Sequence, residues 1–240
     1  MSTGNWKERT ELLVGAEGIA KLQNAHILVA GLGGVGGYAA EQLCRAGIGK
    51  LTIVDSDSVQ SSNRNRQIIA LKSTQGQKKA EIFRQRLLDI NPDIKLIVKS
   101  DYLLDESIDE LLKVHYDYMV DAIDTLTPKV QLLAKAKLKG LRIVSSMGAG
   151  GRFDPSKVEI TDISKSHHCK FAFAVRKYLK KYNISEGIKV VFSPERVGKS
   201  AVMETKGEKY KKSVVGTISY MPPIFGCYCA SVVIRDILGI

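Results

Sequence analysis

The chain has 240 residues, of which 44% are hydrophobic and 25% are charged. These values are typical of a folded globular protein with a substantial core, and they argue against a disordered or fibrous chain. Lysine and arginine outnumber the acidic residues by 36 to 25, so the formal net charge is +11. This excess favours a polyanionic partner or substrate, with nucleic acid ahead of a membrane.

The cysteines and the N-terminal segment bear on the compartment. The four cysteines form no C-x-x-C pair and no disulfide framework, which argues against a structural zinc site. The first residues, MSTGNWKERTELL, contain no apolar signal core, so we expect a cytoplasmic protein. The apolar stretch at residues 214–234 is interrupted by Pro222 and Pro223. We therefore predict a buried C-terminal helix and no membrane partner.

A polar lead, residues 1–25, contains Arg9 and ends in a predicted helix, Glu17 to Gln23. A strand–turn–helix–strand pattern follows it. Residues 27–30 predict a buried strand, residues 38–46 a helix, and residues 51–54 a second strand that ends before an aspartate. The turn between the first strand and the helix has the G-x-G-x-x-G spacing of a nucleotide-binding loop.

Each glycine of this loop has a physical task. Gly31 allows the sharp turn out of the strand, and Gly33 and Gly34 let backbone N–H groups approach a phosphate. Gly36 lets the helix lie close to the sheet, and the helix N-terminus adds partial positive charge. Asp55, about 20 residues further on, stands where a carboxylate binds ribose hydroxyls. The motif by itself leaves NAD, FAD and ATP open as the ligand.

The polar segment after the second strand starts with Asp57, which we group with the nucleotide ligands. Asn63, Arg64 and Arg66 cluster where the ends of a nucleotide would lie if this loop folds over the glycine turn. We predict a helix that begins at about Arg66.

Two lysines and two aspartates extend the candidate anion site. Lys78 and Lys79 stand in the first turn of a predicted helix, where lysine favours anion binding over helix stability. Asp121 and Asp124 stand at the carboxyl end of a later predicted strand, where a carboxylate can hold Mg²⁺ on a polyphosphate. The elements predicted here are a helix over 77–91, a strand over 94–99, a helix over 107–114, a strand over 117–122, a helix over 128–139 and a strand over 141–146.

The alternation of strands and helices predicts an α/β fold, with a Rossmann-like, mostly parallel sheet and helices on both faces. We expect one domain over residues 1–240, with a nucleotide-binding core at 1–150 and a substrate-side extension at 151–240. The extension is predicted to contain a strand over 158–163, a basic helix over 171–182, a strand over 188–192, a mobile basic loop over 196–213 and the C-terminal helix.

Six spaced elements, RTELLVG, GLGGVGG, IVDSD, the N-x-x-R-Q of residues 63–67, GQKKAE and DAID, resemble the ubiquitin-activating-enzyme-like adenylating superfamily. The resemblance covers residues 9–150. It implies that ATP binds at the glycine turn and that a carboxylate attacks its α-phosphate, giving an acyl adenylate and pyrophosphate.

The resemblance also implies roles for single residues. Arg9 resembles an arginine that reaches into the ATP site of a partner subunit, which implies a homodimer. The nucleotide roles that it implies are Asp55 for the ribose, Asn63 and Arg66 for the triphosphate, Lys79 for the phosphates and Asp124 for Mg²⁺. The expected catalytic set is therefore Arg9, Arg66, Lys79 and Asp124.

The remainder of the chain indicates the branch of the superfamily. The segments SMGAGGRFDPSKVEITDISKS, AVRKYLKK, KVVFSPE and GTISYMPPIFG resemble the tRNA threonylcarbamoyladenosine dehydratases, over nearly the whole chain. This resemblance implies that the threonyl carboxylate of the modified adenosine is adenylated, and that the carbamoyl nitrogen closes a ring with net loss of water. Because the attack is intramolecular, no cysteine nucleophile is needed.

A tRNA substrate would account for the basic charge, and we expect it to contact the helix at Lys170 to Lys181 and the loop at Arg196 to Lys212. A sulfur-relay protein is a further expected partner. Three alternatives stay open: an enzyme that adenylates the C-terminus of a sulfur-carrier protein, a non-catalytic nucleotide- or tRNA-binding module, and an NAD-dependent oxidoreductase.

Overall fold

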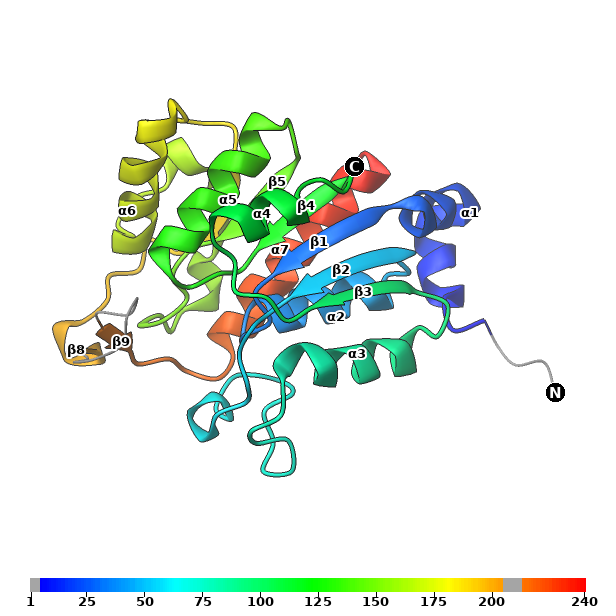
Figure 1. Ribbon diagram of the computed structural model, residues 1–240, viewed down its shortest axis with the longest axis horizontal. Helices are drawn as coiled ribbons and strands as arrows, with labels where there is room; N and C mark the ends of the chain where they lie inside the picture. Colours follow the sequence, from blue (N-terminus) through cyan, green and yellow to red (C-terminus); the bar gives the residue numbers. More distant parts are fainter. Residues whose placement is uncertain (1–4, 205–212) are drawn as a thin grey trace.

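A seven-stranded sheet forms the centre of the structure, a computed structural model that describes residues 5–204 and 213–240 (Figure 1). Its strand order is β3-β2-β1-β4-β5-β7-β6, and all neighbours are parallel except β6 and β7. The strands are β1 (His26–Ala30), β2 (Lys50–Val54), β3 (Lys95–Lys99), β4 (Tyr118–Asp121), β5 (Ile143–Ser146), β6 (Glu159–Asp162) and β7 (Lys189–Phe192). Since β2 and β4 flank β1, the chain changes direction across the sheet there, which is where open α/β sheets bind ligands.

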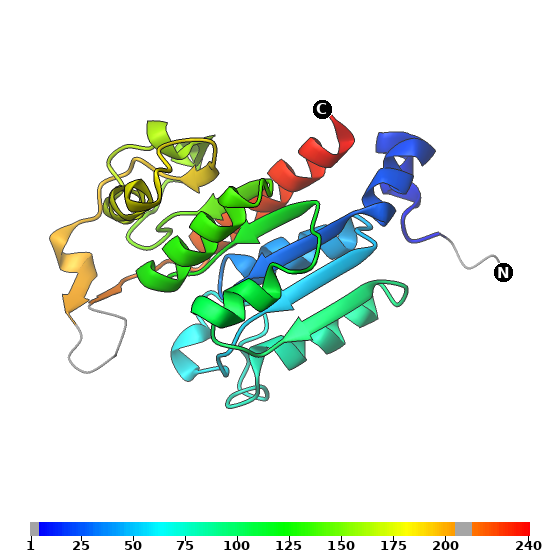
Figure 2. The ribbon, with the colours of Figure 1, turned by 45° about the horizontal axis from the view of Figure 1, so that its top comes forward.

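Helices cover both faces of the sheet (Figures 1 and 2). One apolar layer packs α1, α2, α3 and α7 on one face, and a second packs α4, α5 and α6 on the other. The helices are α1 (Glu8–Asn24), α2 (Gly36–Arg45), α3 (Lys79–Ile90), α4 (Asp105–Leu111), α5 (Leu126–Leu138), α6 (Lys170–Leu179) and α7 (Met221–Leu238). Strand β1 serves both layers, with Ile27 and Val29 in the first and Leu28 in the second, as its period of two requires. The predicted fold class is confirmed.

Helix α1 begins at Glu8, well before the predicted start at Glu17, so Arg9 lies in a helix. Gly15, with φ of 72°, interrupts the helical backbone. The half after Gly15 packs on the core through Leu22, whereas the half before it is mostly exposed. The sequence pattern misses the exposed half because an apolar face at helical spacing is what reveals a helix.

The helix predicted to begin at about Arg66 is wrong. Residues 61–63 form a short 3-10 helix, and turns follow up to residue 77. The carboxamide oxygen of Asn63 accepts a hydrogen bond from the backbone N–H of Gln60 at 3.0 Å. Polar side chains that bond to nearby backbone in this way compete with helix formation.

The segment predicted as a basic loop, residues 196–213, contains a short helical turn, one strand and the first residue of a second strand, none of which the sequence predicted. Val202 of β8 lies opposite Val215 of β9, and β-branched residues of this kind favour strands. Residues 205–212 of the predicted loop lie outside the described residues. The additional elements are β8 (Val202–Glu204), β9 (Ser213–Val215) and the 3-10 turns Pro155–Lys157, Ile163–Lys165, Lys180–Tyr182 and Lys199–Ala201.

Helix α7 is the predicted C-terminal core helix. Met221, Phe225, Cys229 and Val233, spaced four residues apart, are fully buried and belong to the layer that contains α2. By length and composition, α7 is the one helix among the described residues that could span a membrane. Its packing against α2, β4 and β5 accounts for its apolar face.

Candidate active site

A cavity of about 440 Å³ opens at the carboxyl ends of β1, β2 and β4, where the sheet changes direction. Eight of the predicted site residues line it, and they come from three separate loops and the start of α3. The predicted residues that line the cavity are Gly31, Gly33, Asp55, Asp57, Asn63, Arg66, Lys79 and Asp124.

The glycine turn forms the base of the cavity. Gly31 has φ of 87°, and a Cβ there would lie 2.9 Å from the carbonyl oxygen of Ala122, so this position needs glycine. A Cβ on Gly36 would lie 1.8 Å from the carbonyl oxygen of Gly31, which confirms the predicted close packing of α2. Gly33 faces open space except for one side-chain atom at 3.6 Å, whereas Gly34 lies against α7 and does not line the cavity.

Asp55 is held at the end of β2 by two backbone donors. The N–H of Leu32, in the glycine turn, donates to one carboxylate oxygen at 2.6 Å, and the N–H of Asp57 donates to the other at 2.8 Å. Burial raises the pKa of Asp55 above its ordinary value, although Lys79 and the two N–H groups favour the charged form. Asp55 therefore joins the glycine turn to the start of the next loop.

Lys79 supplies a buried cation at the N-terminus of α3. Its side chain is 6% exposed, and its Nζ lies 2.8 Å from a carboxylate oxygen of Asp57, which is itself 68% exposed. Lys78 points elsewhere, since its Nζ donates to the carbonyl oxygen of Ser56 at 2.8 Å and it does not line the cavity. Of the two predicted lysines, the structure thus brings only Lys79 to the site.

The loop after β2 brings an arginine and two carboxamides to the cavity. Arg66 is half-buried, and its Nη1 donates to the carbonyl oxygen of Ser62 at 3.0 Å and to the side chain of Asn65 at 2.8 Å. Gln67 is 8% exposed, and its Oε1 has no hydrogen-bond partner among the described residues. Gln67 belongs to the N-x-x-R-Q motif, but the motif alone indicated no role for it.

The loop after β4 separates the two predicted aspartates. Asp124 is exposed and lines the cavity. Asp121 is fully buried and forms an ion pair with Lys129 at 2.6 Å, so its candidacy for Mg²⁺ is wrong. Lys129 also donates to the carbonyl oxygen of Ile123 at 3.0 Å, and Ser145 donates to Asp121 at 2.6 Å. This buried network supports the backbone that carries Asp124.

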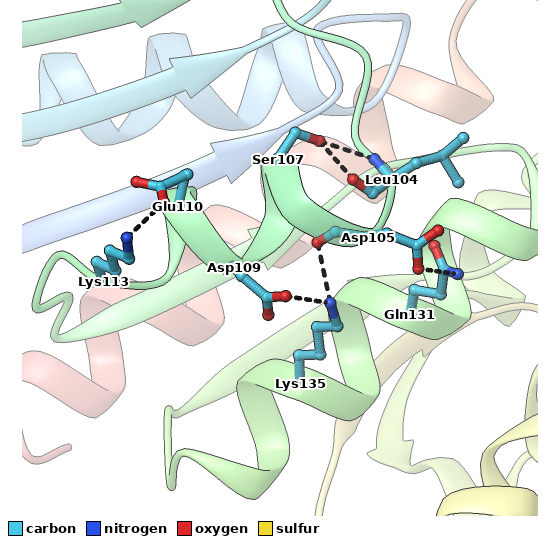
Figure 3. Close-up of polar contacts among 8 residues, drawn as sticks. All are labelled: Leu104, Asp105, Ser107, Asp109, Glu110, Lys113, Gln131 and Lys135. Atoms are coloured by element: carbon cyan, nitrogen blue, oxygen red, sulfur yellow. Dashed lines mark hydrogen bonds and ion pairs between the residues drawn. The ribbon is translucent and has the colours of Figure 1, made fainter.

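A fourth loop, residues 101–103, closes one side of the cavity, and the sequence did not identify it. Figure 3 shows how the helix that follows is anchored: Ser107 bonds with both backbone groups of Leu104, and Lys135 of α5 donates to the carbonyl oxygen of Asp105 and to Asp109. The contacts from Lys135 come from a residue distant in the chain, so a local pattern could not have indicated them.

Arg9 does not line the cavity formed by its own chain. It is exposed in the first turn of α1, a helix that leads into the amino end of β1, whereas the cavity lies at the carboxyl ends of the strands (Figure 1).

Comparison with known proteins identifies the family. The family model described as ThiF family matches residues 8–240. The chain belongs to the ThiF family. It is 36% identical over 237 residues to the tRNA threonylcarbamoyladenosine dehydratase of Bacillus subtilis, with 96% of this chain and 93% of the relative covered. It is also 36% identical over 219 residues to the dehydratase of Escherichia coli, with coverage of 90% and 80%.

Solved structures agree with this placement of the ThiF-family chain. The E. coli tRNA N6-threonylcarbamoyladenosine dehydratase in complex with ATP superposes with a TM-score of 0.89 at 32% identity, covering 98% of this chain and 95% of that chain. The complex of the same enzyme with AMP gives a TM-score of 0.88. E. coli MccB, at 18% identity and a TM-score of 0.66, shares the fold.

The site of this ThiF-family protein is suited to a polyphosphate. Lys79, Arg66, the backbone N–H groups of the glycine turn and the N-terminus of α2 all offer positive charge or donors at one cavity. Asp55 lies at its edge as an acceptor for hydroxyl groups. The arrangement therefore offers several cationic groups and N–H donors at one cavity, as a polyphosphate requires.

Proposed function

We propose that this protein uses ATP to adenylate the threonyl carboxylate of N6-threonylcarbamoyladenosine in tRNA, and that it then cyclises this group with net loss of water. The observation that carries the proposal is the extent of similarity, which includes 96% of this chain and 93% of the Bacillus subtilis dehydratase. The yeast adenylyltransferase and sulfurtransferase UBA4 is 34% identical, but over 65% of this chain and 35% of its own length. The near-complete coverage of both chains thus favours the dehydratase activity.

The chemistry of the proposed reaction balances without an enzyme nucleophile. One oxygen of the carboxylate bonds to the α-phosphorus of ATP while the bond to pyrophosphate breaks. The carbamoyl nitrogen then bonds to the activated acyl carbon, the bond to AMP breaks, and the nitrogen loses its proton. Charge develops on the α-phosphate and on the leaving pyrophosphate, where Lys79 and Arg66 would stabilise it, and this is usually the largest catalytic contribution.

Mg²⁺ would be held by Asp124 together with phosphate oxygens. Mg²⁺ commonly takes one or two carboxylates plus substrate phosphates and water, so the exposed carboxylate of Asp124 at the cavity fits this use. The described residues contain no cluster of three or more metal-ligating side chains. When bound, the ion would neutralise charge on the phosphates; Asp124 would position it.

The tRNA would contact α6 and the predicted basic loop at residues 196–212. The protein would work in the cytoplasm. Lys170 and Lys177 of α6 are exposed. Phe173 is 62% exposed and Tyr178 is 40% exposed on the same helix. Exposed cations attract RNA phosphates, and exposed aromatic rings stack on unpaired bases. Arg176 belongs to the fold instead, since it donates to the carbonyl oxygen of Ser166 at 2.7 Å.

A homodimer would complete the site with Arg9 from the partner. Arg9 is exposed, and Leu12 and Leu13 in the same half of α1 are 82% and 86% exposed. Neighbouring exposed leucines of this kind favour contact with another chain. Arg9→Ala and Lys79→Met proteins should each be inactive alone. When equal amounts are mixed and the subunits exchange, half of the dimers are heterodimers, and one of the two sites in each heterodimer is intact. We therefore expect about a quarter of wild-type activity. No recovery in exchanged heterodimers would contradict a shared site.

The test of the proposed function is mass spectrometry of nucleosides from threonylcarbamoyl-modified tRNA after incubation with the purified protein, ATP and Mg²⁺. We expect the modified adenosine to lose the mass of one water only when ATP is present, and without any sulfur-relay protein. Asp124→Asn should abolish the change. If pyrophosphate is released but the tRNA mass is unchanged, a protein carboxylate is the substrate instead.

A further inference from the structure

Arg152 is buried without the partners that a buried guanidinium needs. Its exposed fraction is 2%, and its Nε and Nη1 atoms have no hydrogen-bond partner within residues 5–204 and 213–240. The nearby carboxylate of Glu195 is already engaged, because it accepts hydrogen bonds from the backbone N–H groups of Phe153 and Asp154 at 3.0 Å. Buried charges without acceptors are rare in native proteins, so this one calls for an acceptor that the described residues do not supply.

Arg152 lies on the same side of the sheet as the nucleotide cavity. It follows the carboxyl end of β5, next to β4, whose loop brings Asp124 to that cavity. The loop before it is fixed, since the N–H of Gly151 donates to the carbonyl oxygen of Gly216 at 2.7 Å. The adjacent Thr217 accepts a hydrogen bond through its carbonyl oxygen from Asn65 at 2.9 Å. One extended segment thus joins the Arg152 loop to the loop that carries Arg66.

The chemistry of the missing acceptor follows from charge and burial. A guanidinium presents a planar set of N–H donors that matches the two oxygens of a carboxylate or a phosphate. A backbone phosphate of folded RNA is flanked by sugars on both sides, and it cannot readily approach a group that is 98% covered. A carboxylate carried on a substituent of a base is smaller than an internal phosphodiester, and it still offers the two oxygens that a guanidinium pairs with. The substrate proposed above carries such a carboxylate.

We propose that Arg152 binds the threonyl carboxylate of the modified adenosine and presents it to the nucleotide. This inference rests on the proposed function. Arg152 is then a substrate-binding residue in the loop after β5, separate from the loops that carry the residues assigned to ATP. It accounts for how a carboxylate on RNA is selected among the many phosphates of the same molecule.

The experiment compares wild-type protein, Arg152→Met, Arg152→Lys and a matched control, Arg142→Met. Arg142 is exposed directly before the amino end of β5, whereas Arg152 follows its carboxyl end, so the replacement of Arg142 changes the net charge equally and far from the cavity. For each protein, we would measure the affinity for ATP, the KM for modified tRNA, and the affinity for the same tRNA without the threonylcarbamoyl group. Unchanged ATP affinity serves as the evidence that each variant is folded.

We expect Arg152→Met to raise the KM for modified tRNA at least tenfold, to leave ATP affinity and unmodified-tRNA affinity at wild-type values, and to abolish the preference for modified tRNA. The KM of Arg152→Lys for modified tRNA should lie between the values of the wild-type protein and of Arg152→Met. An equal loss of affinity for both tRNAs would assign Arg152 to a phosphodiester and overturn the proposal. Wild-type kinetics in Arg152→Met would overturn it as well, while leaving the dehydratase function intact. Failure of the wild-type protein to act on modified tRNA would reject that function itself.

Discussion

The buried ion pair between Lys129 and Asp121 should dominate the stability of the loop that carries Asp124. Both side chains are fully buried, and their charged atoms lie 2.6 Å apart. Lys129→Met keeps the length and most of the volume of the side chain but leaves the Asp121 carboxylate without its counter-charge. Removal of one partner of a buried pair costs about 3–5 kcal/mol, which corresponds to a Tm about 6–20 °C lower for a chain of this size.

A double variant separates the charge from the hydrogen bonds. In Asp121→Asn/Lys129→Met the charge is removed, and the new carboxamide can still accept from the N–H of Ile123 and pair with Ser145. The carbonyl oxygen of Ile123 would still lose its donor, at a cost of about 1–3 kcal/mol. We therefore expect the double variant to be more stable than Lys129→Met alone.

Urea denaturation, followed by circular dichroism, measures both effects. The matched control is Lys135→Met on the same helix, whose ion pair with Asp109 lies at the surface (Figure 3) and should contribute about 0–1 kcal/mol. If Lys129→Met lost no more stability than Lys135→Met, or if the double variant were no better than the single one, the reasoning from the buried charge would be refuted.

Three further predictions concern other parts of the molecule. Lys79→Met should lower the rate of pyrophosphate release by about 10²–10³-fold, whereas Lys78→Met, at an exposed lysine outside the cavity, should leave it unchanged; equal losses would contradict the assignment. Burial would raise the pKa of Glu41, but hydrogen bonds from two arginines outweigh this effect and hold the pKa below its usual value. The ionised carboxylate of Glu41 therefore stabilises the fold at neutral pH, and this contribution is lost as the pH falls from about 4.3, the unfolded-state pKa, through the lower folded-state pKa. In urea titrations, the loss of unfolding free energy caused by Glu41→Gln should shrink in acid. A loss that does not change with pH would count against this. Burial raises the pKa of Cys229 to about 12, so iodoacetamide followed by peptide mass spectrometry should find the exposed Cys227 labelled first, and equal labelling would be inconsistent with the packing of α7.

The local patterns in the sequence were sufficient to predict the fold class. Apolar runs of strand length, helical spacing and the glycine turn are properties of neighbouring residues, so they can be read without knowing the partners in space. Gly31 shows this directly, since its positive φ follows from the turn itself. The exposed half of α1 and the pairing of β8 with β9 were missed because neither has a core-facing apolar pattern.

Only the tertiary structure distinguished residues that look equivalent in the sequence. Asp121 and Asp124 both follow the same strand, but Lys129 of α5 folds back to bury and neutralise the first and leaves the second at the cavity. Lys78 and Lys79 are adjacent, yet only the second turns toward Asp57 and the nucleotide site. Arg152 looked like one basic residue among 36, until packing buried it and left its Nε and Nη1 without an acceptor in the part of the chain that the structure describes. The sequence by itself thus determined the elements and the chemistry available at the strand ends. Burial and long-range charge pairing, which depend on residues far apart in the chain, decided which of those groups face the cavity.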